Sequence, residues 1–182
     1  MIQAKFKEGT DTLESFYEQI IEQQLAGHGK EYCNQHNAIR EHVKGKVYRE
    51  LGTHQGATAA CALLAGATSV TMVDISTKLI NPNFHLFEAY AKEHGVPIEL
   101  MESNSHSLDT VGDCDVLLID SKHTPAHLKK ELAIHADRVR EHIILHDTFA
   151  KRGLSKVAYA LEGWKVMVDE KVNVGYMVLG RK

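Results

Sequence analysis

The chain has 182 residues, 43% of them hydrophobic and 25% charged, with a formal net charge of −3. This length and apolar content suit a single core, and the lack of a lysine and arginine block argues against nucleic acid as a partner. No apolar run approaches the about 20 residues of a membrane span, and the first residues lack the apolar centre of a signal peptide. We therefore expect a soluble cytoplasmic protein that does not contact a membrane.

The cysteines agree with that location. Cys33, Cys61 and Cys114 are odd in number and form no C-x-x-C pair. This pattern indicates free thiols in a reducing compartment and excludes a disulfide framework or a zinc ribbon.

An amphipathic helix is predicted near the N-terminus. Apolar side chains recur there at three- and four-residue spacing, at Leu13, Phe16, Tyr17, Ile20, Ile21 and Leu25. The pattern follows an Asp11-x-x-Glu14 start and stops at Gly27 and Gly29. A second short helix is expected from about residue 34 to residue 43. Residues 1–44 then form a helical segment that packs on a domain of residues 45–182.

Strands and helices alternate in the larger domain. The expected strands cover residues 46–51, 69–73, 97–101, 114–119 and 142–146, and the expected helices cover residues 56–65, 82–94 and 125–140. Near-continuous apolar strands separated by helices indicate a parallel sheet with helices on both faces. Asn81-Pro82 and Thr124-Pro125 each place a capping side chain before a proline, which favours helix starts there.

The C-terminal segment has a different pattern. After a helix around residues 155–161, two apolar strands at 164–168 and 172–179 are separated by only three residues, Asp169-Glu170-Lys171. A parallel crossover needs a longer connection than this, so the two strands are predicted to form an antiparallel hairpin.

A ligand-binding turn is predicted at Glu50–Gly56, between the first expected strand and an alanine-rich helix. Gly52 allows a tight reversal of the chain, Gly56 allows a ligand to approach the backbone, and the new helix offers free N–H groups to an anion. Asp74 ends the next apolar run, 22 residues after Gly52, where a carboxylate accepts hydrogen bonds from ribose hydroxyls. The spacing G-x-x-x-G differs from the dinucleotide pattern G-x-G-x-x-G, which argues against NAD.

This turn resembles motif I of class I S-adenosylmethionine (SAM) methyltransferases, and the resemblance continues along the chain in the family's order. Asp74 matches the acid after the second strand, Asp120 the acid ending the fourth strand, and residues 143–148 the fifth strand. More narrowly, E-L-G-x-x-x-G-x-[ST], the serine Ser105, I-D-x-x-H and H-D-T are similar to metal-dependent O-methyltransferases, such as the catechol, cephalosporin-hydroxylase-like and macrolide sugar O-methyltransferase groups. The resemblance covers roughly residue 43 to the C-terminus.

The resemblance implies an α/β, Rossmann-like class I methyltransferase fold, with a mostly parallel seven-stranded sheet and a C-terminal antiparallel hairpin. It implies that SAM is held by Glu50, Gly52, Thr53, Gly56, Thr58, Asp74, Ile75, Ser105, His106 and Asp120. Two of these assignments have alternatives. Thr58 either bonds the methionine carboxylate or only fills the helix start, and Asn104 competes with Ser105 and His106 for adenine.

Asp120 and Asp147 fall at neighbouring strand ends, where two carboxylates repel each other unless a cation or a proton lies between them. The resemblance implies a divalent cation held by Asp120, Asp147, His146 and Thr148. Mg²⁺ suits the oxygen ligands, whereas a histidine ligand shifts the preference toward Mn²⁺, Fe²⁺ or Zn²⁺. The alternative is that Asp120 faces SAM and Asp147 caps the following helix.

His123 matches the general-base lysine of the catechol enzymes, and Lys122 competes for that role. The alternative is that His123 only begins a helix. The predicted function is metal-assisted O-methylation of a small hydroxylated molecule. The alternatives are a metal-free methyltransferase for an amine or a protein side chain, and a SAM- or nucleoside-binding module without transfer activity. The apolar stripe of the first helix is expected to cover the acceptor site or to form a homodimer contact.

Overall fold

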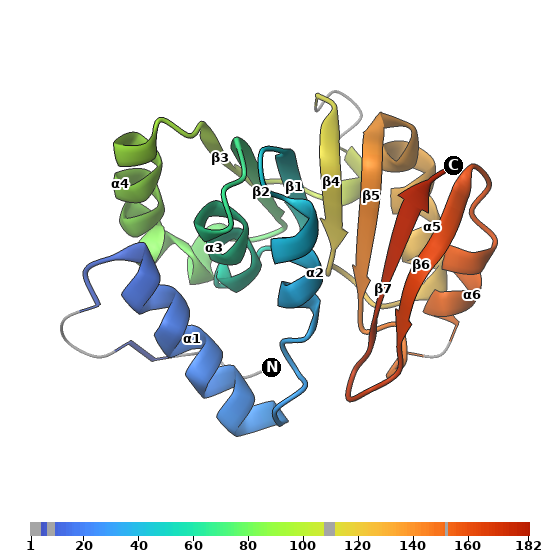
Figure 1. Cartoon of the computed structure of the whole chain (residues 1–182), viewed down its shortest axis with the longest axis horizontal. Helices are drawn as coiled ribbons and strands as arrows, with labels where there is room; N and C mark the ends of the chain where they lie inside the picture. The colour runs from blue at the N-terminus through green and yellow to red at the C-terminus, as the bar shows by residue number, and fades with distance from the viewer. Residues whose placement is uncertain (1–4, 7–9, 108–111, 152) are drawn as a thin grey trace.

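A seven-stranded sheet in the order β3-β2-β1-β4-β5-β7-β6 runs through the computed structural model (Figure 1), which describes residues 5–6, 10–107, 112–151 and 153–182. Its strands are β1 Val47–Leu51, β2 Ser69–Asp74, β3 Ile98–Glu102, β4 Cys114–Ile119, β5 Val139–His146, β6 Trp164–Glu170 and β7 Tyr176–Arg181. Strands β1 to β5 pair in parallel, and β7 pairs antiparallel with both β5 and β6. The predicted fold class is confirmed.

Helices cover both faces of this sheet. One core lies under α1 Leu13–His28, α2 Gln35–His42, α3 Ala57–Leu64 and α4 Phe84–His94. The other lies under α5 Pro125–His135 and α6 Leu154–Tyr159. In Figure 1, α2 and α3 stand in front of the sheet, and α5 and α6 stand behind it. Both layers bury nearly continuous apolar strands, as the sequence pattern requires.

The helix α3 is buried on all sides, from Ala57 to Leu63. A helix that is apolar all round needs neighbours on its outer face as well as the sheet beneath it. Both α1 and α2 contact α3, so the N-terminal helices complete the first core. The small side chains of α3 allow this close packing.

The apolar stripe of α1 points into that core. Leu13, Phe16 and Ile20 are almost fully buried, and the Phe16 ring meets the Phe87 ring of α4 edge-on at a centroid distance of 5.4 Å. The stripe therefore packs within the chain itself. The helix begins with a capping box between Thr12 and Ser15, three residues apart as in the predicted start but one position later.

Several of the expected element boundaries differ from the structure. The helix predicted for residues 125–140 ends at His135, and β5 begins at Val139, which pairs with Cys114. The hairpin turn follows Glu170 because Glu170 still pairs with Tyr176 in the ladder. Asn173 and Gly175 adopt left-handed backbone conformations in this turn, which asparagine and glycine tolerate better than other residues.

The proposed proline caps are only partly correct. Asn81 does not cap a helix: it begins a 3-10 turn, Asn81–Asn83, and its amide donates to Thr77 Oγ1 at 3.2 Å. Thr124 does occupy the N-cap position of α5, but its side chain makes no capping hydrogen bond. Proline at the first helical position suffices to start this helix.

The cysteines and the helices bear on two expectations from composition. Cys33, Cys61 and Cys114 are all free thiols. Across the described ranges, no helix combines the length and the apolar character that a bilayer crossing requires.

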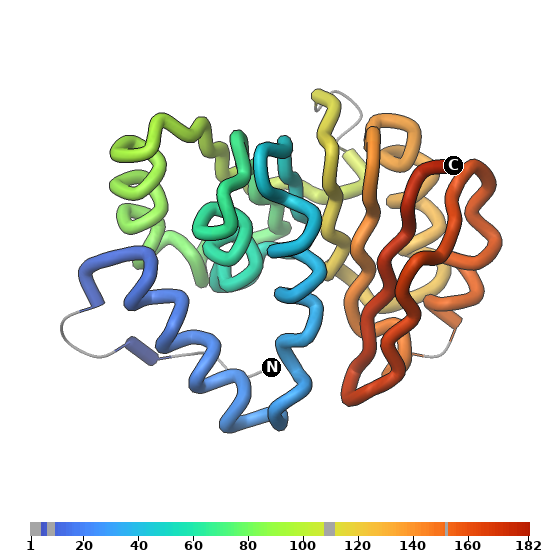
Figure 2. Tube along the Cα trace, in the orientation of Figure 1, coloured from blue at the N-terminus to red at the C-terminus, as the bar shows by residue number. Residues whose placement is uncertain are grey.

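The segment between α1 and α2 passes along the carboxyl ends of the parallel strands (Figure 2). The Asn173 amide in the β6–β7 turn donates to the His28 carbonyl oxygen at 2.8 Å. This bond ties the end of α1 to the hairpin. The polar residues that follow the apolar stripe are thereby held over the sheet edge where ligands gather in such folds.

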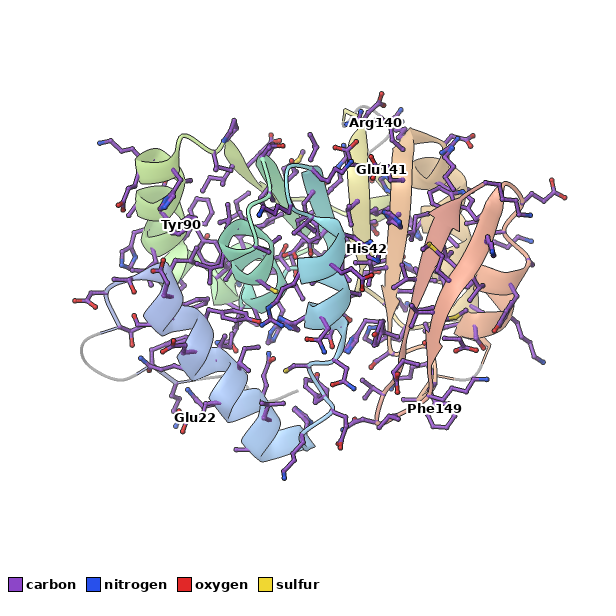
Figure 3. The ribbon with its side chains drawn as sticks, viewed as in Figure 1. Glu22, His42, Tyr90, Arg140, Glu141 and Phe149 are labelled. Carbon is purple, nitrogen blue, oxygen red and sulfur yellow. The ribbon has the colours of Figure 1, made fainter. Side chains whose placement is uncertain are left out.

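Replacing Phe16 by alanine should lower the free energy of unfolding by about 3–5 kcal/mol, because it removes a fully buried ring that joins α1 to α4. Glu22→Ala in the same helix is the matched control. Its side chain is exposed and points away from the molecule (Figure 3), so it should change stability by less than about 0.5 kcal/mol. Urea unfolding measures both. Equal effects would show that α1 is not part of the core.

Candidate functional site

The turn after β1 joins three strand ends. Gly52 has a φ of +95°, and a Cβ atom there would lie 2.2 Å from the carbonyl oxygen of Asp120. The Gly52 N–H donates to the Val73 carbonyl at 2.8 Å, and the Asp120 N–H donates to the Leu51 carbonyl at 2.8 Å. Glycine is required at this position because the end of β4 passes directly against the turn.

Gly56 serves packing. It is the left-handed N-cap residue of α3, with a φ of +89°. A Cβ atom there would lie 2.7 Å from the Phe87 ring and 2.8 Å from Ile80. The interpretation that Gly56 lets a ligand approach the backbone therefore needs correction, since side chains of the core occupy that space.

His54 lies between these glycines with a left-handed φ of 51°. This conformation is uncommon for a residue with a Cβ atom and is often found at functional sites. The His54 N–H donates to Asp74 Oδ2 at 2.7 Å, and the Ser76 N–H donates to Oδ1 at 3.1 Å. Asp74 is thus held at the end of β2 by main-chain bonds on both oxygens.

Glu50 is fully buried at the end of β1. Its Oε2 accepts hydrogen bonds from Tyr48 Oη at 2.9 Å and Thr58 Oγ1 at 2.7 Å, and Oε1 has no partner in the described part of the chain. Burial raises the pKa of Glu50 to about 7, against the opposing effect of the hydrogen bonds from Thr58 and Tyr48. The Thr58 hydroxyl therefore donates to Glu50 and is not available to donate to a ligand.

Four ionisable side chains meet at the ends of β4 and β5. His123 Nε2 lies 2.9 Å from Asp120 Oδ1, and His123 Nδ1 lies 2.8 Å from Asp147 Oδ2. His146 Nδ1 lies 3.0 Å from the same Asp120 oxygen and 3.7 Å from Asp147 Oδ1. The imidazole of His123 thus bridges the two carboxylates whose mutual repulsion the sequence predicted.

Charge attraction sets the protonation of this cluster. Burial disfavours the charged form of His123, but the hydrogen bonds to Asp120 and Asp147 outweigh it and raise the pKa to about 9. Burial likewise opposes protonation of His146, yet attraction to Asp120 raises its pKa. The two histidines in turn hold the pKa of Asp120 well below its usual range, against the effect of burial. At neutral pH His123 carries a proton between the carboxylates.

Asp147 does not cap a helix. Its carboxylate contacts His123, and the helix that follows, α6, begins after Gly153. Asp147 also has a left-handed φ of 58°. A second non-glycine residue in this conformation at the same sheet edge is consistent with a site that holds strained residues in place.

Two cavities open at this edge. The first, of about 340 Å³, lies between the four-residue cluster, the start of α3 and five N-terminal residues, which are Gln24, His28, Tyr32, Gln35 and His36. The second, of about 410 Å³, extends past Asp74 and Ile75 to Ser105, Ser121 and His127. Gly52, His54 and Asp120 line both cavities. One elongated ligand is able to occupy parts of both, within the size range of small-molecule sites.

The predicted residues divide between the cavities. The first cavity is lined by Gly52, Thr53, Thr58, Asp120, His123, His146 and Asp147. The second is lined by Gly52, Asp74, Ile75, Ser105, Asp120 and Lys122. Four predicted residues line neither cavity, namely Glu50, Gly56, His106 and Thr148. Lys122 is exposed and lies away from the first cavity, whereas His123 is placed within it.

A cation site would use a different ligand set from the predicted one. Within the described residues, Asp120, His123 and His146 bring one donor atom each to within 4.8 Å of one another. Thr148 is buried, and its hydroxyl does not line the first cavity. Two imidazole nitrogens and a carboxylate oxygen suit Mn²⁺, Fe²⁺ or Zn²⁺ better than Mg²⁺.

Several lining residues were not predicted from the sequence. Tyr32 and His36 carry no motif, and only their position after an amphipathic helix brings them to the site. Burial, reinforced by Asp120 and Asp147, raises the pKa of Tyr32 to about 12. Burial lowers the pKa of His36 to about 3, so its imidazole is neutral. Glutamine and histidine recur between residues 24 and 36, and this polar cluster after the apolar stripe is the sequence signal for the cavity wall.

The chain matches no protein-family model, and no curated protein is similar to it in sequence. Solved structures do share its fold. The ribosomal protein L11 methylase of Lactobacillus delbrueckii subsp. bulgaricus is 20% identical with a TM-score of 0.64, covering 86% of this chain and 81% of the methylase chain. The magnesium protoporphyrin IX methyltransferase of Synechocystis PCC 6803, with bound SAM, is 14% identical with a TM-score of 0.64, covering 98% and 86%.

A third structure is the methyltransferase PaMTH1 of Podospora anserina with bound S-adenosylhomocysteine (SAH). It is 15% identical with a TM-score of 0.63, covering 94% of this chain and 88% of that chain. At these identities the likeness establishes the fold, which is the class I methyltransferase fold.

Glu50→Gln should change the pH dependence of stability. The folded pKa of about 7 lies above the ordinary value of 4.5, so stability is lost as pH rises through this interval and the buried acid ionises. Glutamine keeps an acceptor for Tyr48 and Thr58 without the charge. The variant should therefore gain up to about 3 kcal/mol relative to the wild type between pH 5 and pH 8.

Urea unfolding at both pH values measures this gain. The exposed Glu93→Gln is the control and should show no such gain. A Glu50→Gln effect that is equal at pH 5 and pH 8 would contradict a raised pKa for Glu50.

Proposed function

We propose that the protein transfers a methyl group from SAM to a hydroxyl group of a small molecule. The observation that carries this proposal is the pair of adjoining cavities. One contains a strand-end carboxylate suited to ribose, and the other contains the imidazole–carboxylate cluster of Asp120, His123, Asp147 and His146. The SAM sulfonium supplies an activated methyl group when it is bound, so the protein has mainly to position and deprotonate the acceptor.

The chain's residues fit SAM. Asp74 and Ile75 line the second cavity, where the carboxylate would accept hydrogen bonds from a ribose and the aliphatic side chain would pack against a purine ring. Ile75 is 75% exposed, so a ligand would cover it. At the other end, Ala57 and Thr58 present the start of α3 to the first cavity, where free N–H groups favour a carboxylate.

We infer a small acceptor because the N-terminal part of the chain covers one side of the first cavity. Residues from α1, α2 and the segment between them form its outer wall. A nucleic acid or a folded protein would have to displace helices that bury Phe16 and Ile20 in the core. This wall is the reason to favour a small molecule, although some proteins of this fold act on macromolecules.

Deprotonation of the acceptor falls to His123, since it lies in the first cavity between two carboxylates. With a pKa of about 9, His123 must first lose its own proton. A bound divalent cation would take over this task, because a Lewis acid favours loss of the hydroxyl proton to solvent; His123, with one ring nitrogen on the metal and the other bonded to Asp147, would then be a ligand and not the base. Asp120, His123 and His146 would hold this cation.

Calorimetry should show that SAH binds and NAD does not. Asp74→Asn should weaken SAH binding about 5- to 150-fold, by losing a charge-assisted hydrogen bond worth about 1–3 kcal/mol. Asparagine retains an acceptor for the His54 N–H, so the turn is less disturbed than by alanine. Asp113→Asn, an exposed acid at the start of β4, should leave the affinity unchanged. Binding of NAD in place of SAH would refute the proposed cofactor.

The cation is tested by titrating Mn²⁺ into the protein and recording its electron paramagnetic resonance. Wild type should bind Mn²⁺, and His146→Ala should bind it at least about 10-fold more weakly because a ligand is lost. Methylation of a catechol probe should then stop with a chelator and return with Mn²⁺. If Mn²⁺ does not bind and turnover survives the chelator, the enzyme is metal-free.

If SAH binds but no acceptor in a panel of phenols, catechols and amines is methylated, the chain is a binding module.

A further inference from the structure

The second cavity rests on a buried carboxylate outside the methyl-transfer cluster. Glu131, in the middle of α5, has no exposed surface. Its Oε1 accepts hydrogen bonds from Ser105 Oγ at 2.6 Å and from Ser121 Oγ at 2.6 Å, and it lies 3.2 Å from His127 Nε2. A buried carboxylate is costly unless donors satisfy it; here two hydroxyl donors converge on Oε1, while Oε2 has no partner among the described residues.

This arrangement fixes the direction of two hydroxyl protons. Glu131 Oε1 accepts both of these bonds, and a serine hydroxyl has one proton to donate but can accept further bonds. Ser105 and Ser121 each give their proton to Glu131, so their oxygens offer only lone pairs to any other group. Both serines line the second cavity. The wall of the cavity near them therefore presents hydrogen-bond acceptors.

The helix α5 also holds the main chain of Ser105. His135 Nε2 donates to the Ser105 carbonyl at 2.8 Å, and His135 lies one helical turn after Glu131 on the same face. Ser105 itself is only 8% exposed. The serine is thus clamped through both its carbonyl and its hydroxyl, and its lone pairs keep one orientation.

We propose that Glu131 is a positioning residue that makes the second cavity selective for an aminopurine over an oxopurine. The inference rests on the proposed function, which places the ribose at Asp74 and the purine farther along the cavity, toward the serines. The exocyclic amino group of adenine donates to an acceptor wall. The carbonyl of hypoxanthine in the same place meets lone pairs and leaves polar groups unpaired, which is how buried polar sites reject an analogue.

The test compares two ligands that differ only at this purine position, SAH and S-inosylhomocysteine, by calorimetry. Wild type should bind SAH at least about 10-fold more tightly. Glu131→Leu should bring the ratio of the two affinities to about one or below, because it removes the oxygen that accepts from Ser105 and Ser121 and leaves both hydroxyl protons free to face the cavity. Glu93→Gln, an exposed acid on α4, should keep the wild-type ratio.

Two further variants keep the test decisive if Glu131→Leu folds poorly. Ser105→Ala and Ser121→Ala leave the carboxylate in place, and at least one of them should lower the affinity ratio. A purely structural role of Glu131 would weaken both ligands equally and keep the ratio. Equal binding of the two ligands by wild type, or an unchanged ratio in all three variants, would overturn the inference alone. Binding of neither ligand by wild type would overturn the proposed function as well.

Discussion

The close approach of Gly52 to the main chain of Asp120 is the constraint on which the site depends. No other residue type leaves room for the Asp120 carbonyl at this point, since a Cβ would lie 2.2 Å away. The contact brings the ends of β1 and β4 together, with the end of β2 bonded to the same turn. Both cavities are lined by Gly52 and Asp120, so a ligand that spans them must pass this contact. The Gly52–Asp120 contact therefore sets how the first cavity is placed relative to the second.

Charge compensation is the second organising feature. Two carboxylates and two imidazoles share the first cavity, and for Asp120, His123 and His146 their attraction outweighs the effect of burial on the pKa. The positive charge that the acid pair requires is already supplied by His123. A divalent cation would therefore compete with protons for this cluster, and its binding must release them. Any binding of a cation at this site would therefore depend on pH.

Much of the fold could be predicted because it follows from short-range pattern. Alternating apolar strands and helices, and the short connection before residue 176, sufficed for the sheet and its hairpin. Boundaries that depend on pairing with distant strands were missed, such as the start of β5 at Val139, which is set by Cys114 on β4. At the site, acids at strand ends were located by topology. The left-handed backbone of His54 and Asp147, and the role of Gly56 in packing, depend on tertiary contacts that no local signal encodes.

The packing of α1 and α2 over α3 has a consequence for biosynthesis. A ribosome makes α1 first, yet the surfaces that bury Phe16 belong to α3 and α4, which emerge later. Until residues 57–94 are available, the N-terminal stripe remains open to solvent and to other chains, which is when nascent proteins are most prone to association. The burial of α1 and α2 therefore depends on residues that are synthesised after them. A nascent chain stopped before α3 would therefore leave Phe16 and Ile20 exposed.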